Sequence, residues 1–168
     1  MKPVQSLLLP VMLIFSVPLY AEEKNETYAS IRVLSAPLAA KIATTAEQYC
    51  FKKGYQVSVA VTDRYGTLLA FSRNPLAGAH TIVVSQNKAY TSATFQLASI
   101  NTMDDMEFMR GVPHISLIGG GLPIRVGGHM YGAIGVSGAP ANKKPGDVDE
   151  DCARAGLDAV MGDLEFAD

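Results

Sequence analysis

The sequence predicts an α+β domain in which a mainly antiparallel sheet of about five strands is flanked by helices. The alternating, β-branched run 57–62 and the run 67–72 are separated by a four-residue turn, and such a hairpin pairs its strands antiparallel. Helical spacing of apolar residues appears before the hairpin, after it and at the C-terminal end. A chain of 168 residues that is 48% apolar fits one such domain.

The first helix is expected to begin after Ser35 and to end at Gly54. Ser35 is a good N-cap, and Pro37 lies in the first turn, where its missing N–H removes no hydrogen bond. Gly54 is typical of the residue that follows a helix. In the hairpin that comes next, Asp63 is expected to bond the backbone N–H groups of its own turn.

A second helix is expected over residues 80–98, after the chain-breaking residues Asn74, Pro75 and Gly78. Its apolar pattern is interrupted by the polar run 86–88. A weak capping box then predicts a short helix from Thr102 to about Arg110.

The segment 111–138 holds nine glycines among three short β-prone runs, at 115–118, 124–126 and 131–136. Glycine within a strand marks a turn, a bulge or a close approach by another backbone or a ligand. We therefore expect this half of the sheet to be built around something that comes near the main chain.

The last helix is expected to begin at Asp147, with Glu150 three residues later as its capping partner. It contains Cys152, and the first helix contains Cys50; the chain has no other cysteine. Terminal helices of α/β domains often pack side by side, so a disulfide between the two cysteines is expected. Two buried free thiols are the alternative.

The N-terminal residues 1–21 read as a secretory signal, with Lys2 followed by an apolar stretch too short to span a membrane. An uncleaved anchor is the alternative. A loosely ordered lead over 22–30 and a domain over 31–168 would follow, in a periplasmic or secreted protein without stable membrane insertion. The net charge of −2 and the scattered basic residues argue against nucleic-acid binding.

Four segments in order resemble one known family: VSVAVTDRYGTLLAFSR (57–73), NKAYTSA (87–93), GGGLPI with GGHMYGAIGVSG (119–138), and DVDEDCARAGL (147–157). On these residues the chain resembles the GlcG/HbpS-type haem-binding proteins, a family that includes the C-terminal domain of PduO. The resemblance covers nearly all of the chain after its first 30 residues. A single glycine motif is weak, whereas four segments in this order are specific.

The resemblance implies a five-stranded antiparallel sheet flanked by helices, assembled into homo-oligomers. Members of the family bind haem, and some are described as haem-degrading or as haem sensors that work with a membrane kinase. Others occur with glycolate or diol metabolism. The iron ligand differs between members, so no ligand is carried over by motif.

The candidate ligands of haem iron are therefore weighed on physical grounds. His80 starts a helix, whose dipole favours the neutral imidazole that ligates iron. His114 follows Pro113 at the entrance to the glycine-rich segment. An ordinary surface histidine is the alternative at both positions.

Three groups could hold the carboxylates of haem or of a small acid. Arg73 ends a strand, and Lys88 interrupts a helix, where a specific partner and plain solvent exposure are both consistent with the pattern. Gly119, Gly120 and Gly121 could form an anion-binding nest of N–H groups or simply a tight turn.

No nucleophile–base pair, G-x-S-x-G elbow or metal-ligand spacing stands out, so the sequence predicts no catalytic residue. Whether the protein is an enzyme stays open, and haem degradation is an activity that the family resemblance implies. The sequence favours an exported homo-oligomer that binds haem b and stores, buffers or senses it. One alternative is a sensor or enzyme for a small, glycolate-like organic acid, and another is a purely structural subunit.

Overall fold

The computed structural model describes residues 27–102 and 105–166. The expected signal over 1–21 lies outside the described residues, as do residues 22–26 of the expected lead. From Ile31 onward the chain forms one compact unit. No helix among the described residues has both the length and the apolar character needed to cross a bilayer.

The described part of the chain contains four α-helices, two short 3-10 helices and four strands. In chain order they are α1 (Ala36–Lys52), β1 (Ser58–Asp63), β2 (Leu68–Arg73), α2 (His80–Phe95), η1 (Ser99–Thr102), η2 (Glu107–Met109), β3 (Gly121–Val126), β4 (His129–Ser137), α3 (Asp147–Asp158) and α4 (Met161–Glu165).

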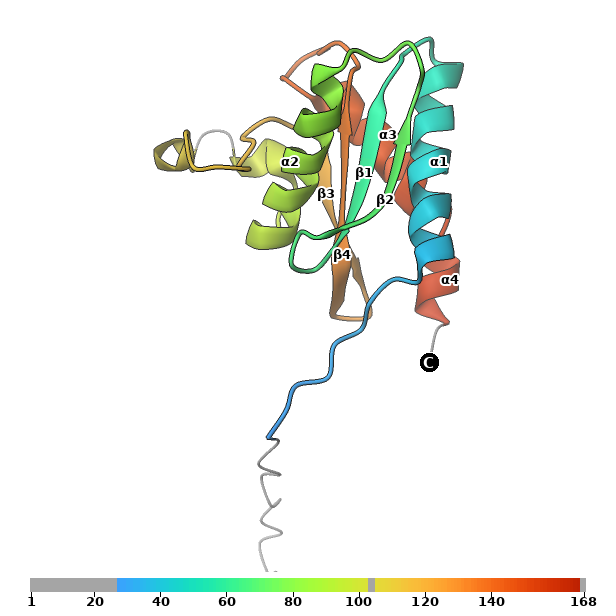
Figure 1. The fold of residues 1–168 in the computed structure, drawn as a ribbon, viewed down its shortest axis with the longest axis vertical. Helices are drawn as coiled ribbons and strands as arrows, with labels where there is room; N and C mark the ends of the chain where they lie inside the picture. The colour runs from blue at the N-terminus through green and yellow to red at the C-terminus, as the bar shows by residue number, and fades with distance from the viewer. Residues whose placement is uncertain (1–26, 103–104, 167–168) are drawn as a thin grey trace, which may run out of the picture. The chain divides into compact units, whose positions relative to one another are not determined.

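The sheet has the strand order β2-β1-β4-β3, and every neighbouring pair is antiparallel (Figure 1). Strands β1 and β4 are therefore central, and β2 and β3 are the edges. In the β1–β2 register Ala60 lies opposite Phe71 and Ser58 lies opposite Arg73. A β-bulge between Val61 and Thr62 shifts the register at the turn end of this hairpin.

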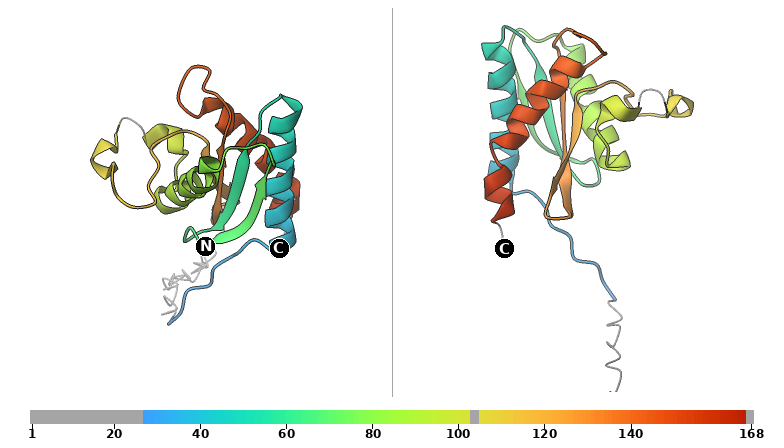
Figure 2. Two further views of the ribbon diagram at one scale, coloured as in Figure 1. Left: turned by 45° about the horizontal axis from the view of Figure 1, so that its top comes forward. Right: turned by 180° about the vertical axis from the view of Figure 1, so that it is seen from behind.

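Helices cover the two faces of the sheet differently. Helices α1 and α3 pack against each other on one face, whereas α2 lies on the other face, over β1, β4 and β3 (Figures 1 and 2). The segment between α2 and β3, which carries η1 and η2, projects away from the sheet beyond α2 (Figure 1). In the reverse view of Figure 2, α3 crosses in front of the strands.

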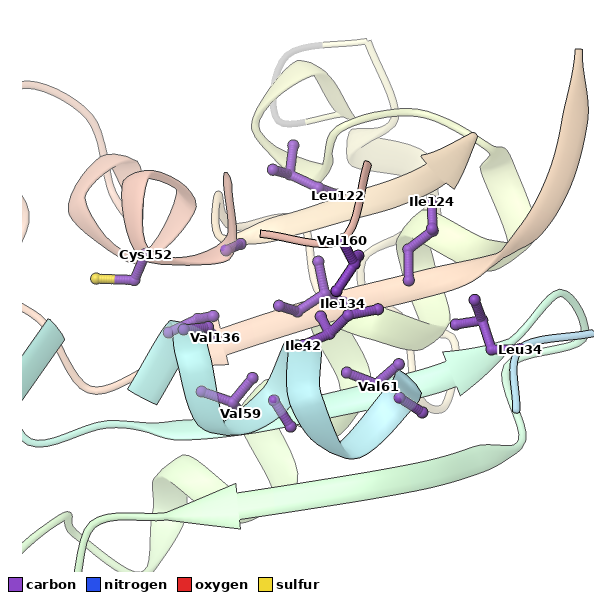
Figure 3. Close-up of a cluster of buried hydrophobic side chains, with 14 of the residues drawn as sticks. Leu34, Ile42, Val59, Val61, Leu122, Ile124, Ile134, Val136, Cys152 and Val160 are labelled. Atoms are coloured by element: carbon purple, nitrogen blue, oxygen red, sulfur yellow. The ribbon is translucent and has the colours of Figure 1, made fainter. Parts of the chain in front are cut away.

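The face beneath α1 and α3 is built from large apolar side chains (Figure 3). Ile42 of α1 lies among Val59 and Val61 of β1 and Ile134 and Val136 of β4, and each of these side chains is fully buried. Removing this much apolar surface from water provides the main driving force for folding. We call it the large-residue face.

The face beneath α2 is built from small residues, and we call it the small-residue face. Gly135 lies opposite both Ala60 and Gly121 in the sheet. A Cβ atom added to Gly135 would collide with the carbonyl oxygen of Ser85, and one added to Gly121 would collide with that of Lys88. The close approach expected of the glycine-rich segment is therefore made by the backbone of α2.

The α+β class and the antiparallel sheet are confirmed, but the described residues form four strands where about five were expected. The run 115–118 is not a strand, because its backbone bonds go to side chains outside the sheet. The Ser116 N–H donates to Thr91 Oγ1 (2.8 Å), and the Ile118 carbonyl accepts from Ser99 Oγ (2.7 Å).

Helix ends also differ from the expected ones. Helix α2 stops at Phe95, because Gln96 adopts a left-handed backbone with φ of 56°. The expected helix over 102–110 is only the 3-10 turn η2, preceded by η1. The last helix is divided into α3 and α4, and its N-cap is Gly146 where Asp147 was expected.

Candidate functional site

A cavity of about 250 Å³ opens on the small-residue side, between the turn end of the β1–β2 hairpin and α2. It is lined by Thr62, Gly66, Leu68, Gln86, Asn87, Tyr90 and His114. We call it the hairpin cavity. Its lining combines an imidazole, a phenol, two amides and an apolar side chain, and it contains no lysine or arginine.

His114 stands at this cavity in a left-handed backbone conformation, with φ of 67°. Few non-glycine residues adopt this conformation, so its occurrence at a cavity suggests a functional constraint. The imidazole meets the ring of Tyr90 edge-on, with 5.8 Å between the ring centroids. The bond from the Ser116 N–H to Thr91 ties the following residues to α2 and thereby positions His114.

The hairpin turn forms the opposite wall. Asp63 Oδ1 accepts hydrogen bonds from the N–H groups of Tyr65 (2.8 Å) and Thr67 (2.9 Å), as the sequence predicts. Gly66 has a φ of 84°, and any side chain there would collide with the ring of Tyr90. The turn therefore needs glycine for its conformation and for its contact with α2.

Beside the cavity, β2 presents side chains that no helix covers among the described residues. Leu68, Phe71 and Arg73 face the same side as α2, because their partners on β1 are Thr62, Ala60 and Ser58. Ser58 fixes which side this is, since its Oγ lies 2.7 Å from Thr81 Oγ1 of α2. Leu68 is 45% exposed and Phe71 is 37% exposed. We call these three β2 side chains the open face.

Helix α2 carries a further exposed apolar side chain, Val83, which precedes the cavity residue Gln86 by about one helical turn. Arg73 and His80 lie at the far end of the open face. Arg73 donates a hydrogen bond to the carbonyl oxygen of Ala77, and the exposed His80 ring folds back over Gly78. The expected site residues Arg73 and His80 are thus neighbours across the loop 74–79.

The structure does not bring His80 and His114 together. Ten residues of α2 separate His80 from Tyr90, the neighbour of His114, which corresponds to about 15 Å along the helix. A metal–imidazole bond is about 2 Å long, so these two side chains cannot ligate the same iron in this arrangement.

Lys88 is placed where no ligand reaches it. Its side chain is 2% exposed, and its ammonium donates to Asp149 Oδ2 (2.7 Å) and to the carbonyl oxygen of Val136 (2.9 Å). Burial lowers the pKa of Lys88 and raises the pKa of Asp149, while the attraction within the pair opposes both shifts. This lysine holds α2 to β4 and α3, so it has a specific partner, but that partner is a carboxylate of the chain itself and not of a ligand.

The run from Gly119 to Gly121 is also buried, and its polar groups are occupied. The Gly119 N–H donates to the carbonyl oxygen of Pro145 (3.0 Å), and the Gly121 N–H donates to Ser99 Oγ (2.8 Å). These N–H groups are therefore bonded within the chain and form no open nest for a ligand carboxylate. The run is not a tight turn between strands either, because no strand directly precedes it and it leads from a bend into β3.

Cys50 and Cys152 form a disulfide that joins α1 to α3, with their Cα atoms 5.6 Å apart. Both residues are fully buried on the large-residue face, away from the hairpin cavity. The disulfide belongs to the scaffold and not to the candidate site.

The sequence analysis missed Tyr90, Gln86 and Asn87 as site residues. A signal for them was present, because the polar run 86–88 interrupts the apolar pattern of the helix. Two of its three members line the cavity, and the third is the buried Lys88. The described residues contain no cluster of three or more His, Cys, Asp or Glu side chains that could hold a metal ion.

Comparison with known proteins places the chain beside a family model, a curated relative and two solved structures. A family model described as "Haem degrading protein HbpS-like" matches residues 34–158. Protein GlcG of Escherichia coli strain K12 is 33% identical over 112 residues, which cover 62% of this chain and 81% of that protein.

Among solved structures, a double mutant of Streptomyces reticuli HbpS superposes with a TM-score of 0.71 at 30% identity, covering 86% of this chain and 97% of that one. The structure of a PduOC–haem complex superposes with a TM-score of 0.67 at 20% identity, covering 76% and 94%, which shows the shared fold alone.

Proposed function

This chain belongs to the HbpS-like family, and from that premise we propose that it binds haem b and stores, buffers or senses it. The description of the family as haem-degrading supports haem as the ligand class. The observation that carries the proposal is the imidazole of His114 at the hairpin cavity, directly beside an uncovered apolar surface. A bound haem supplies an iron centre that takes its axial ligand from the protein.

In this proposal His114 would be the residue that holds the haem iron. Its distorted backbone, its contact with Tyr90 and its place in the lining of the cavity all support that role. The fit of the residues to haem is favourable, because a porphyrin needs apolar contacts and the open face offers Leu68 and Phe71 next to the cavity.

The hairpin cavity holds only a part of a porphyrin. Ligand pockets that bury most of a drug-sized molecule measure about 300–1,000 Å³, and the hairpin cavity measures about 250 Å³. The remainder of the ligand would lie against the open face and Val83. This surface is shallow, so a single copy of the chain would leave much of the haem exposed.

We further propose that the protein is exported and acts in the periplasm or outside the cell. The signal-like residues 1–21 motivate this, and the Cys50–Cys152 disulfide supports it, since disulfides persist in oxidising compartments. Mass spectrometry of the protein from a periplasmic fraction tests it: a mature N-terminus near Glu22 is expected, and a full-length chain in the cytoplasm would contradict it.

The central test is a hemin titration of the purified protein, followed at the Soret band. The wild type is compared with His114→Ala and His80→Ala, and His129→Ala is the matched control because His129 lies at the β3–β4 turn beside a different hollow. We expect saturation at one haem per subunit, a loss of the shifted band in His114→Ala only, and wild-type behaviour of the control.

Two results would reject this assignment. A weak, unsaturable spectral change in the wild type would remove haem binding altogether. Loss of binding in His80→Ala with retention in His114→Ala would assign the iron to His80, at the other end of the open face.

A second candidate is supported by the size of the cavity. Its volume of about 250 Å³ and its amide groups, from Gln86 and Asn87, are compatible with a small organic acid such as glycolate that lies wholly within the cavity. The buried Lys88 and the closed glycine run do not contribute to this version of the site. Thermal stabilisation of the protein by millimolar glycolate, lost in Asn87→Ala, is the expected result.

A further inference from the structure

Strand β2 is an edge of the sheet, and its sequence, Leu68-Leu-Ala-Phe-Ser-Arg73, lacks the features that usually protect an edge. Natural edge strands carry proline, lysine or inward-pointing charges that prevent pairing with another chain. Here the single charge is at the last residue, and the bulge lies at the other end. The part from Ala70 to Ser72 is therefore regular and uncharged, and it can pair with another strand.

The hairpin cavity lacks a cation. Haem carries two carboxylates, yet no lysine or arginine lines this cavity. Arg73 of the same chain is five residues along β2 from Leu68, which corresponds to about 17 Å. Arg64, in the hairpin turn itself, does not line the cavity either; its guanidinium lies over the ring of Tyr65, 5.7 Å from the ring centroid.

We propose that two copies of this chain pair through their β2 edges about a two-fold axis at Phe71, and that each copy's Arg73 completes the hairpin cavity of the other. The inference rests on the proposed function, because it assigns Arg73 to the carboxylates of the same haem. A two-fold contact of this kind uses one patch twice, so the patch must be complementary to itself.

The register follows from antiparallel pairing. An axis at Phe71 places this ring beside the partner's Phe71, and it places Arg73 opposite the partner's Leu69. The partner's Leu68 is the next residue and lines the partner's hairpin cavity. Arg73, Phe71 and Leu68 share one side of the sheet, the side where the cavity opens. In this proposal the guanidinium exchanges its hydrogen bond to the Ala77 carbonyl of its own loop for the carboxylate of the haem at the partner's cavity.

Charge and exposure favour a second copy over another partner. The two Arg73 side chains would stand four residues apart along the paired strands, about 14 Å, which exceeds the screening length of about 10 Å at 0.1 M salt. Their repulsion is therefore weak. Pairing also covers Phe71 and Leu68, and it forms a trough between the two α2 helices that encloses the exposed part of the ligand.

The first test is the molecular mass in solution, measured by light scattering with and without hemin. Phe71→Lys is compared with Phe108→Lys, a matched control because Phe108 is also exposed but lies on η2, away from β2. We expect the wild type and the control to be dimers or assemblies of dimers. In Phe71→Lys the β2 edges should no longer pair, so each dimer should separate into single chains of half its mass. An unchanged mass in Phe71→Lys overturns the proposal.

The second test mixes two variants that are each defective alone. Arg73→Ala keeps His114 but lacks the arginine, and His114→Ala keeps the arginine but lacks the ligand. Random exchange of subunits creates some dimers with one complete site, so hemin affinity should return to the wild-type value in about a quarter of the sites. Arg73→Ala alone should weaken hemin binding by about tenfold.

If Arg73 served its own chain, mixing would give only the average of the two parents, and this result overturns the inference while leaving haem binding intact. A wild-type protein that takes up no hemin overturns the proposed function instead. In that case the mass comparison still decides whether the β2 edges pair.

Discussion

The two faces of the sheet pack against their helices in different ways, one through large side chains and the other through direct backbone contact. On the large-residue face, branched side chains such as Ile42, Val61 and Ile134 fill the space between the strands and α1. On the small-residue face, glycines of β3 and β4 let the backbone of α2 lie directly on the strands. The first face is closed by the Cys50–Cys152 disulfide, and the second leaves β2 uncovered beside α2.

This difference separates stability from binding. Side chains of the large-residue face do not line the hairpin cavity, so changes there should alter the free energy of unfolding and leave ligand affinity unchanged. The side of α2 combines a rigid backbone contact with the hairpin cavity and the open face. Binding residues on that side are held by a helix that cannot shift without colliding with the sheet.

The largest effect on stability is expected at Lys88 of α2, whose ammonium forms a buried ion pair with Asp149 of α3. Lys88→Met leaves a carboxylate buried without its partner, and breaking a buried ion pair in this way costs about 3–5 kcal/mol. Chemical denaturation of the variant measures this loss. The double variant Lys88→Met with Asp149→Leu should recover much of it, and a loss that is equal in both variants would contradict the pairing.

The disulfide gives the next effect, on the large-residue face alone. Replacing both cysteines by alanine opens a loop of 102 residues, and loss of a disulfide of this kind costs about 2–4 kcal/mol. Thermal unfolding with and without reductant measures it, because reductant should destabilise the wild type and not the variant. Hemin affinity well below the unfolding temperature should be equal in both; a weaker affinity would show that the two faces are coupled.

A smaller effect is expected where α2 meets the sheet. Gly135→Ala places a methyl group against the carbonyl oxygen of Ser85, and such overpacking costs about 1–3 kcal/mol. Because α2 must move away from β4, hemin affinity should fall together with stability. Gly162→Ala is the matched control, since nothing lies within 4 Å of a Cβ atom at Gly162. Unchanged hemin affinity in Gly135→Ala would separate the helix position from binding.

Local signals made much of this fold predictable. Ser35 caps α1 with a bond from the Leu38 N–H, Asp63 stabilises its own turn, and Cys50 and Cys152 meet between helices. Each of these predictions depends on a short motif or on a pair of rare residues. The glycine-rich segment was also predicted to admit a close neighbour, although the sequence does not tell a ligand from a helix.

Long-range contacts decided the rest. The run 115–118 has the composition of a strand, but its backbone bonds to Thr91 and Ser99 keep it off the sheet. Lys88 finds its partner 61 residues away, a distance that no local pattern reports. The hairpin cavity likewise joins a turn, a helix and the loop of His114, so its members are recognised together only in three dimensions.

The smallest effect concerns Asp147, where α3 begins on the large-residue face. Hydrogen bonds from the N–H groups of Asn142 and Lys143 lower the pKa of this carboxyl from 3.8 to about 2. A lowered pKa means that the carboxylate contributes stability above pH 4 and loses that contribution as the pH falls toward 2. Asp147→Asn should therefore be less stable than the wild type at neutral pH, and the difference should vanish near pH 2.

Asp158→Asn, at the other end of α3, is the control, and chemical denaturation at several pH values measures both variants. Because Asp147 is half-buried at the start of α3 and does not line the hairpin cavity, its replacement should leave the hemin titration unchanged. A pH-independent difference would mean that the loop is held by something other than this carboxylate.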